Sequence, residues 1–224
     1  TTVLTLAVGI TVATTGLSLA TAVLGARLPF EDGDRWLSVS WSGAPGTPGD
    51  SVSTHLLDPL RESRSFDHVA GWRSGVVNVG LPSDEVEPVT VAAITPSTLG
   101  RIGVSPLVGR ALQPADARRG APPVVVLRES VWRRRFAGDP ATVGRSVSLG
   151  GVNHRVVGVL PADALFPAGG EAWVALRDDP DVPIAPGLDG TTHLVIVAAP
   201  GMTAAVAAQR IDAVAHAAFP GTAH

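Results

Sequence analysis

The first 26 residues of this 224-residue chain contain no charged side chain, and Val3 to Ala26 is an almost unbroken apolar run. A helix of 24 residues would be roughly 36 Å long, against about 30 Å for the hydrocarbon core of a bilayer. Gly9, Ala13, Gly16 and Ala20 recur at helical spacing and would let a second membrane helix approach closely. The sequence therefore predicts a transmembrane helix within residues 1–28.

A cleaved signal peptide is the alternative interpretation of this segment. Its apolar stretch is usually about 7–15 residues long and follows a basic start, whereas this run is longer and no basic residue precedes it. The only methionine is Met202, so we expect the sequence to be a fragment of a longer chain. Arg27 and Arg35 are balanced by acidic residues between 31 and 34, so charge alone does not fix the membrane orientation.

The composition argues against several kinds of function. The 17 basic and 20 acidic residues give a net charge of −3, which disfavours nucleic-acid binding. Without cysteine there is no thiolate zinc site and no cysteine nucleophile, and without lysine there is no phosphate loop ending in GK[ST]. The HExxH and GxSxG motifs are also missing. We therefore predict no enzyme activity and no catalytic, cofactor-binding or metal-binding residue.

Beyond residue 28 the sequence predicts an α+β fold, because strands and helices mix without strict alternation. The expected strands are 36–41, 76–79, 86–94, 121–127, 145–149, 152–160, 172–176 and 194–198, with Gly150 and Gly151 turning one hairpin. The expected helices run from Ser51 or Ser53 to about Glu62, from Pro96 to about Gly103, over 129–136, and over 203–219 with Thr203 as cap. A short turn of helix is expected over 66–72, and loops over 43–50 and 81–84.

Two pairs of side chains have the spacing of an acid and a histidine that could act together. Asp212 and His216 are four residues apart on the last expected helix, and His55 and Asp58 are three residues apart on an earlier one. Pairs with this spacing are common on exposed helix faces and contribute only a few tenths of a kcal/mol. We interpret both as surface pairs. A secreted hydrolase with a Ser/His/Asp site assembled from distant residues would escape this test of spacing, but no feature of the sequence favours it.

Two charged clusters are the remaining candidates for a binding site. Asp178, Asp179 and Asp181 could bind Ca²⁺, but their Pro-rich surroundings favour a solvated loop. The run from Arg133 to Arg135 follows Trp132 on an expected helix, so its members point in different directions. A nucleic-acid or lipid-headgroup site would need further basic residues nearby. A solvated face with a structural ion pair is the favoured interpretation of the arginine run.

The segment from Gly120 to Pro161 is more specific, because it combines a PVVVL strand, a W-x-R-R-F-x-G-D-P turn, a V-G-R tripeptide and a V-V-G-V-L-P strand. It closely resembles the periplasmic core domain of MacB-like, FtsX-like ABC transporter permeases. The matching positions are Pro123 to Leu127, Trp132, Arg134, Arg135, Phe136, Gly138, Asp139, Pro140, Val143 to Arg145 and Val156 to Pro161.

The resemblance extends over nearly the whole chain. Further positions in family order are Leu4 to Ile10, Arg27 to Phe30, Phe66 to Trp72, Thr95 to Gly103, Gly109, Arg110, Asp116, Trp173 to Leu176, His193 and the helix to Phe219 and Pro220. This sequence departs from the family pattern at Gly150 (usually Asn), at His154 (usually aromatic) and in the shortened segment 198–201. These departures leave the fold credible but weaken inferences about partner contacts.

The resemblance implies a transmembrane helix in 1–28, a porter-like α+β part over 29–106 and 189–224, and an inserted β-rich subdomain over 107–188. It implies a permease subunit of an exporter or mechanotransmission complex in the cell (inner) membrane, with the main domain extracytoplasmic. ATP would be bound only by a cytoplasmic partner subunit or domain. Membrane lipids, a second permease copy and a periplasmic adaptor are further expected partners, and nucleic acid is not. The alternative is a membrane-anchored extracytoplasmic binding module that does not transport.

Overall fold

The computed structural model describes residues 32–39, 51–80, 86–164, 166–167, 169–177, 187–188 and 192–219. The predicted membrane segment, the loops expected over 43–50 and 81–84, and the acidic residues Asp178, Asp179 and Asp181 lie outside this described part. Within it, no helix is both long enough and apolar enough to cross a membrane.

The strands agree with most of the sequence predictions. They are β1 (Trp36–Val39), β2 (His68–Gly80), β3 (Val86–Ile94), β4 (Val108–Gly109), β5 (Val124–Arg128), β6 (Ser146–Leu149), β7 (Val152–Leu160), β8 (Ala172–Ala175) and β9 (His193–Val197). The predicted hairpin is confirmed, since β6 and β7 pair antiparallel on either side of Gly150 and Gly151. Both glycines have positive φ angles of 55° and 87°, which is the conformation such a tight turn requires.

The helices are confirmed as well. They are α2 (Ser51–Glu62), α3 (Ser97–Arg101), α4 (Glu129–Phe136) and α5 (Ala204–Ala218), with short 3-10 turns η1 (Gly33–Arg35), η2 (Pro114–Ala117) and η3 (Pro140–Thr142). Thr203 caps α5, because its hydroxyl oxygen accepts the Val206 N–H at 3.3 Å. The side chains of residues 51–54 are outside the described set, so the predicted capping of α2 stays a prediction.

The helical turn predicted over residues 66–72 is wrong. From His68 onward this segment is the start of β2, a strand of 13 residues. Its backbone pairs with β9 on one side, and from Trp72 onward with β3 on the other. Pairing with β9 over residues 68–72, continued by pairing with β3 from Trp72, gives this segment more hydrogen bonds and burial than an isolated helical turn would, so tertiary contacts override the local preference.

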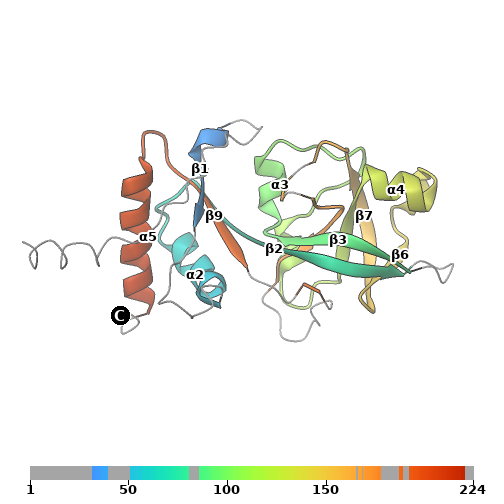
Figure 1. Cartoon of the computed structure of the whole chain (residues 1–224), viewed down its shortest axis with the longest axis horizontal. Helices are drawn as coiled ribbons and strands as arrows, with labels where there is room; N and C mark the ends of the chain where they lie inside the picture. Colours follow the sequence, from blue (N-terminus) through green and yellow to red (C-terminus); the bar gives the residue numbers. More distant parts are fainter. Residues whose placement is uncertain are drawn as a thin grey trace, which may run out of the picture.

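Within the described residues, nine strands form one mixed sheet in the order β1-β9-β2-β3-β8-β5-β7-β4. The β3–β8 and β5–β7 pairs are parallel, and the other pairs are antiparallel. Strand β6 pairs with both β2 and β7, which closes β2, β3, β8, β5, β7 and β6 into a ring that we call the barrel. Strands β1 and β9 with helices α2 and α5 form a second part, the helix layer (Figure 1).

Each part has its own apolar core. The barrel core is filled by alternating side chains of the six strands, including Val77, Val79, Val89, Val91, Val125, Leu127, Val147, Leu149, Val156, Ala172 and Val174. The core of the helix layer packs α2 and α5 on the sheet through Leu56, Leu57, Leu60, Val69, Leu194, Ile196, Ala207, Ile211 and Ala215. Because side chains alternate along a strand, both cores lie on one face of β2: Val69 enters the core of the helix layer, and Val77 and Val79 enter the barrel core.

A third cluster, the shared core, lies on the opposite face of the sheet. On one side this core contains side chains of β1, β2 and β9: Trp36, Ala70, Val195 and Val197. On the other side it contains Leu99 of α3, Ile102 directly after α3, and the barrel residues Val126, Val157 and Trp173. Trp173 is fully buried, and its indole N–H donates to the Phe166 carbonyl at 3.0 Å. The predicted division into a porter-like part and an inserted subdomain stays a prediction; the barrel takes strands from both of those predicted parts.

A close backbone contact holds β4 and the following residue against β7. A Cβ atom on Gly158 would lie 2.1 Å from the Arg110 carbonyl oxygen, and one on Gly109 would lie 2.3 Å from the Val157 carbonyl oxygen. Both obstacles are main-chain atoms, so side-chain rotation cannot relieve them. Glycine at these two positions is therefore required by packing.

We predict that Gly158→Ala lowers the free energy of unfolding by about 2–3 kcal/mol, because it overpacks a backbone contact. Gly100→Ala in α3 is the matched control, since no atom lies within 4 Å of its added methyl group. Alanine favours helix over glycine, so we expect the control to be neutral or up to about 1 kcal/mol more stable. Denaturant titration measures both, and equal effects would contradict this account of Gly158.

Candidate functional site

One of the two acid–histidine pairs predicted from spacing, Asp212 with His216, makes a local contact on the surface. His216 Nδ1 lies 2.8 Å from the Asp212 carbonyl oxygen and 3.9 Å from its carboxylate, on an exposed part of α5. In the other pair, the Asp58 carboxylate accepts a hydrogen bond from Arg61 at 3.2 Å. At 3.9 Å, the Asp212 carboxylate is too far from His216 Nδ1 for a direct hydrogen bond. Among the described residues, no three metal-ligating side chains lie close enough together to hold a metal ion.

The arginine run on α4 forms structural ion pairs, as predicted. Arg133 donates to Glu129 at 2.7 Å within the helix. Arg134 and Arg135 both donate to Glu87 at the start of β3. Desolvation alone would raise the pKa of Glu87, but the hydrogen bonds from these two arginines outweigh it and lower the pKa. These contacts tie α4 to the barrel wall.

The W-x-R-R-F-x-G-D-P motif is a hydrogen-bonded turn. The Trp132 indole donates to the Asp139 carbonyl oxygen at 2.9 Å, which folds the chain back over the end of α4. The Asp139 carboxylate accepts the Ala141 N–H at 2.8 Å and an Arg145 N–H at 3.0 Å. Gly138 has a φ of 69°, a left-handed conformation that glycine adopts without strain. These residues shape the chain and leave no side chain poised for chemistry.

The family-like positions Arg110 and Asp116 form a second structural unit. The guanidinium donates to both carboxylate oxygens, at 2.6 and 2.8 Å, and the carboxylate also accepts the Gln113 N–H at 2.7 Å. Desolvation would raise the pKa of Asp116, but its hydrogen bonds with Arg110 and Gln113 hold the pKa below its ordinary value. This bidentate pair fixes the loop after β4, and its carboxylate is fully engaged.

His68 has the most perturbed environment among the described histidines. Burial is the main cause that lowers its pKa from 6.5 to about 4, and the nearby cations of Arg101 and Arg61 lower it further. Its Nε2 lies 3.4 Å from the Thr98 hydroxyl, and its ring centroid lies 6.2 Å from that of Trp36. The ring is therefore held neutral at the junction of the helix layer and α3.

A row of aromatic rings continues from His68 across this junction. Trp36 and Trp72 each have a centroid about 6 Å from that of Phe166, at 6.0 and 6.1 Å. Trp72 in turn stacks on the exposed ring of His193, with centroids 4.4 Å apart and an angle of 25° between the planes. The sequence offered no sign of this row, because its members are far apart along the chain.

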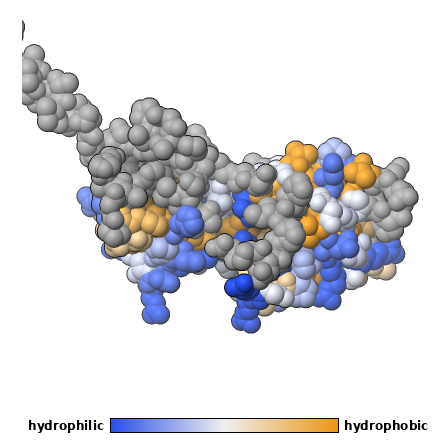
Figure 2. Space-filling view, turned by 90° about the horizontal axis from the view of Figure 1, so that it is seen from below, coloured by the Kyte–Doolittle hydropathy of each residue, from blue (hydrophilic) through white to orange (hydrophobic). Residues whose placement is uncertain are grey.

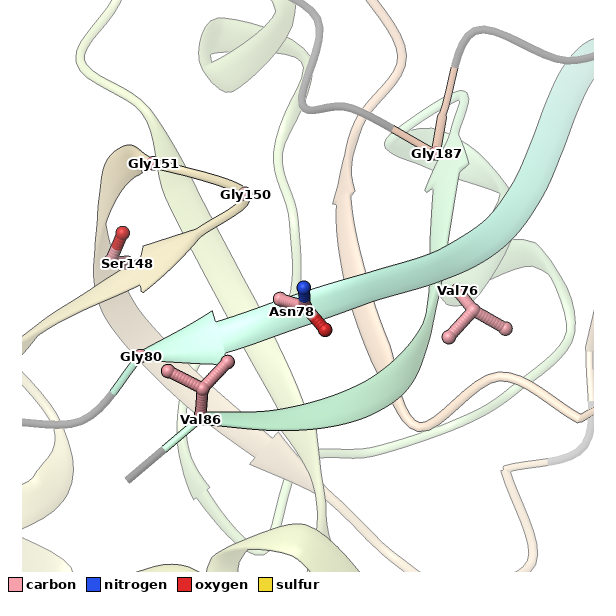
Figure 3. Close-up of a pocket in the computed structure, with 8 residues that line it drawn as sticks. All are labelled: Val76, Asn78, Gly80, Val86, Ser148, Gly150, Gly151 and Gly187. Atoms are coloured by element: carbon pink, nitrogen blue, oxygen red, sulfur yellow. The ribbon is translucent and has the colours of Figure 1, made fainter. Parts of the chain in front are cut away.

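A hollow of about 560 Å³ lies on the outer surface of the barrel (Figure 3). Its lining comes from the outward face of β2, the start of β3, the β6–β7 hairpin and one further glycine: Val76, Asn78, Gly80, Val86, Ser148, Gly150, Gly151 and Gly187. Val76 and Val86 are 63% and 62% exposed. Apolar surface is visible over this half of the molecule when it is seen from below (Figure 2).

The chemistry of the hollow favours contact over catalysis. None of its lining residues is charged, and Asn78 and Ser148 contribute its polar side chains. Four glycines expose main-chain groups there, and such a surface can bind another molecule through shape and backbone hydrogen bonds. Sequence reasoning had assigned Gly150 and Gly151 only to a turn, and Val76 and Val86 only to strands.

We predict that Asp139→Ala lowers the free energy of unfolding by about 1 kcal/mol, because the Ala141 N–H loses its capping acceptor. Asp139→Asn is the matched control: its amide oxygen can still cap, while the half-exposed ion pair with Arg145 is lost. We expect the asparagine variant to retain most of the stability in denaturant titrations. Equal losses in the two variants would show that charge, not capping, dominates.

His68 also predicts a pH dependence of stability. Between about pH 4 and pH 6.5 the unfolded chain binds a proton at this histidine that the folded protein does not, so the free energy of unfolding falls as the pH drops through this window. His68→Gln should flatten this part of the pH profile relative to the parent chain. Denaturant titrations at pH 4.5, 5.5 and 7 measure the difference, and parallel profiles would contradict the prediction.

The sequence matches the family described as the MacB-like periplasmic core domain over residues 1–214. No curated protein matches it. Solved structures with a similar fold include the periplasmic region of MacB from Actinobacillus actinomycetemcomitans, with 16% identity, a TM-score of 0.58, and coverage of 73% of this chain and 72% of that one. A permease domain from Porphyromonas gingivalis has 12% identity and a TM-score of 0.55, covering 73% of this chain and 69% of that one.

The extracellular domain of the noncanonic ABC-type transporter YknZ from Gram-positive bacteria has 12% identity and a TM-score of 0.56, covering 80% of this chain and 88% of that one. At such low identity these likenesses show the fold alone. The family match, by contrast, includes the segment that carries the W-x-R-R-F-x-G-D-P turn. This chain therefore belongs to the MacB-like periplasmic core domain family of ABC transporter permeases.

Proposed function

We propose that this chain is the extracytoplasmic domain, with its first membrane helix, of a permease subunit that couples a cytoplasmic ATPase to movement outside the cytoplasm. The family is one of permease domains, not of enzymes. The described side chains fit that role, because the Asp212–His216 pair is a surface contact and the ionic networks are structural. The chemistry would take place on the ATPase, and this domain would respond mechanically.

The proposal rests mainly on the positions of the first described strand and the last described helix. Strand β1, near its beginning, and helix α5, near its end, both lie in the helix layer (Figure 1). They are packed together through one core, in which Leu37 and Val39 of β1 join Ile211 and Ala215 of α5. The membrane helix proposed within residues 1–28 would therefore act on the helix layer, and β1 and α5 would move together through their common core.

The sheet offers a continuous route from the helix layer to the barrel. Strand β2 pairs with β9 in the helix layer over residues 68–72 and with β6 in the barrel at Val79 and Gly80. At about 3.3 Å per residue, its 13 residues would span roughly 40 Å if fully extended. The shared core supports this strand from one face. A displacement applied to the helix layer would thus reach the hollow on the barrel surface.

The rest of the proposed setting follows from this role. The segment within residues 1–28 would cross the membrane, and the described domain would lie on its extracytoplasmic side. ATP would bind only to the partner subunit or domain, and a second permease copy would complete the assembly. The hollow beside Val76 and Val86 would be available to an adaptor or a cargo.

An anchored binding module is the second candidate, and the hollow is the observation that favours it. In that case the domain would hold a ligand or partner on the barrel surface without any response to ATP. The two candidates differ in one measurable respect, which is whether nucleotide binding on a partner moves this domain.

We therefore predict that the full-length protein stimulates the hydrolysis rate of its partner ATPase severalfold, and that ATP moves the domain. Residues 1–224 contain no cysteine. In a full-length protein whose other cysteines, if any, are replaced by serine, Val86→Cys in the barrel and His216→Cys on α5 each give a single labelling site. Spin labels at either site should show an ATP-dependent change in the distance between two copies in lipid nanodiscs. Labels at both sites should respond, because one sheet connects them.

A partner variant that cannot bind ATP is the control and should abolish the change at both sites. No copurifying ATPase, or no response to ATP at either label, would favour the anchored binding module and overturn the permease proposal.

A further inference from the structure

The barrel core and the core of the helix layer meet at one half-buried side chain, Leu176. This residue directly follows β8, and its N–H donates to the Ile94 carbonyl oxygen at 2.8 Å, which extends the β3–β8 pairing by one residue. Its side chain packs against both cores. Among the described residues, it is the one that appears in both clusters.

A missing side chain on β2 makes room for Leu176. A Cβ atom at Gly71 would lie 2.9 Å from Leu176 Cδ2, and 3.5 Å from both Leu57 Cδ2 and Thr192 Cγ2. Leu57 belongs to α2, and Thr192 directly precedes β9. Both side chains are buried, at 8% and 3% exposure. The space above Gly71 is thus a socket lined by Leu57 and Thr192, and the side chain of Leu176 from the barrel fills it.

The backbone around the socket is rigidly held. The Gly71 N–H donates to the Thr95 hydroxyl at 3.0 Å, and the Thr95 N–H donates to the Gly71 carbonyl oxygen at 2.9 Å. Arg61 of α2 donates to the same hydroxyl at 2.9 Å. Thr95 is buried, so these bonds fix the position of β2 relative to β3 and α2 beside Leu176.

We propose that Leu176, packed over Gly71, links the helix layer to the barrel on the face of the sheet that α2 and α5 cover. With this contact in place, the two parts move together and undergo local unfolding together. The shared core already joins the two parts on the opposite face. With Leu176 in place both faces are tied, and the sheet cannot flex about β2 as a hinge. The functional meaning of this stiffness rests on the proposed mechanical role, but the link itself can be tested without any partner.

The test is amide hydrogen exchange on the whole chain in detergent micelles, comparing amides of α2 and α5 with amides of β5 and β7. In Leu176→Ala, exchange in α2 and α5 should accelerate by about tenfold or more relative to β5 and β7, because packing between the cores is lost. Gly71→Ala should act in the same direction, since its methyl group displaces Leu176 from the socket. If Leu176→Ala does not fold, Leu176→Val replaces it.

Leu149→Ala is the matched control, because Leu149 is fully buried in the barrel core and belongs to that cluster alone. It should accelerate exchange in β5 and β7 at least as much as in α2 and α5. If Leu176→Ala changes both regions by the same factor, or leaves α2 and α5 unchanged, the link is refuted. That result would leave the proposed permease role standing, whereas a lack of ATP response would refute the role and leave the link intact.

Discussion

The rest of the structure depends on the pairing of β2 along both of its edges. Among the described strands, β2 pairs with the helix-layer strand β9 at its start and with the barrel strand β6 at its end. One face of it is buried at Val69 and Gly71 beside α2, and again at Val77 and Val79 inside the barrel. The length of this strand lets it contribute to both cores, so it sets how the helix layer and the barrel are placed along the sheet.

Ion pairs between arginines and carboxylates stabilise this architecture. Arg134 and Arg135 hold α4 to Glu87 of the barrel wall, and Arg110 with Asp116 fixes the loop after β4. Both carboxylates accept charge-assisted hydrogen bonds from arginine, and that of Asp116 also accepts the Gln113 N–H. These ion pairs tie separate segments together, which would suit the mechanical role proposed above.

The strongest sequence signals concerned local structure, and they were reliable where the local pattern decides the outcome. The β6–β7 hairpin, α4 and α5 were predicted from turn glycines, helical spacing and capping, and all three are confirmed. The segment over 66–72 was not predictable in this way, because its conformation is set by pairing with β9, more than 100 residues later in the chain. The hollow and the aromatic row were missed for the same reason: their residues come together only when the barrel and the sheet have formed.

The sequence by itself identified the family, through its resemblance to MacB-like permeases. It also predicted the mixture of helices and strands and most of the element boundaries, because turn chemistry and hydrophobic spacing act over a few residues. Only the tertiary structure decided that six strands close into a barrel, that Gly71 leaves a socket for Leu176, and that Trp36 reaches His68. These contacts join residues that are tens to more than a hundred positions apart. Their partners are chosen by strand register and by packing volume, and neither quantity can be read from a local pattern.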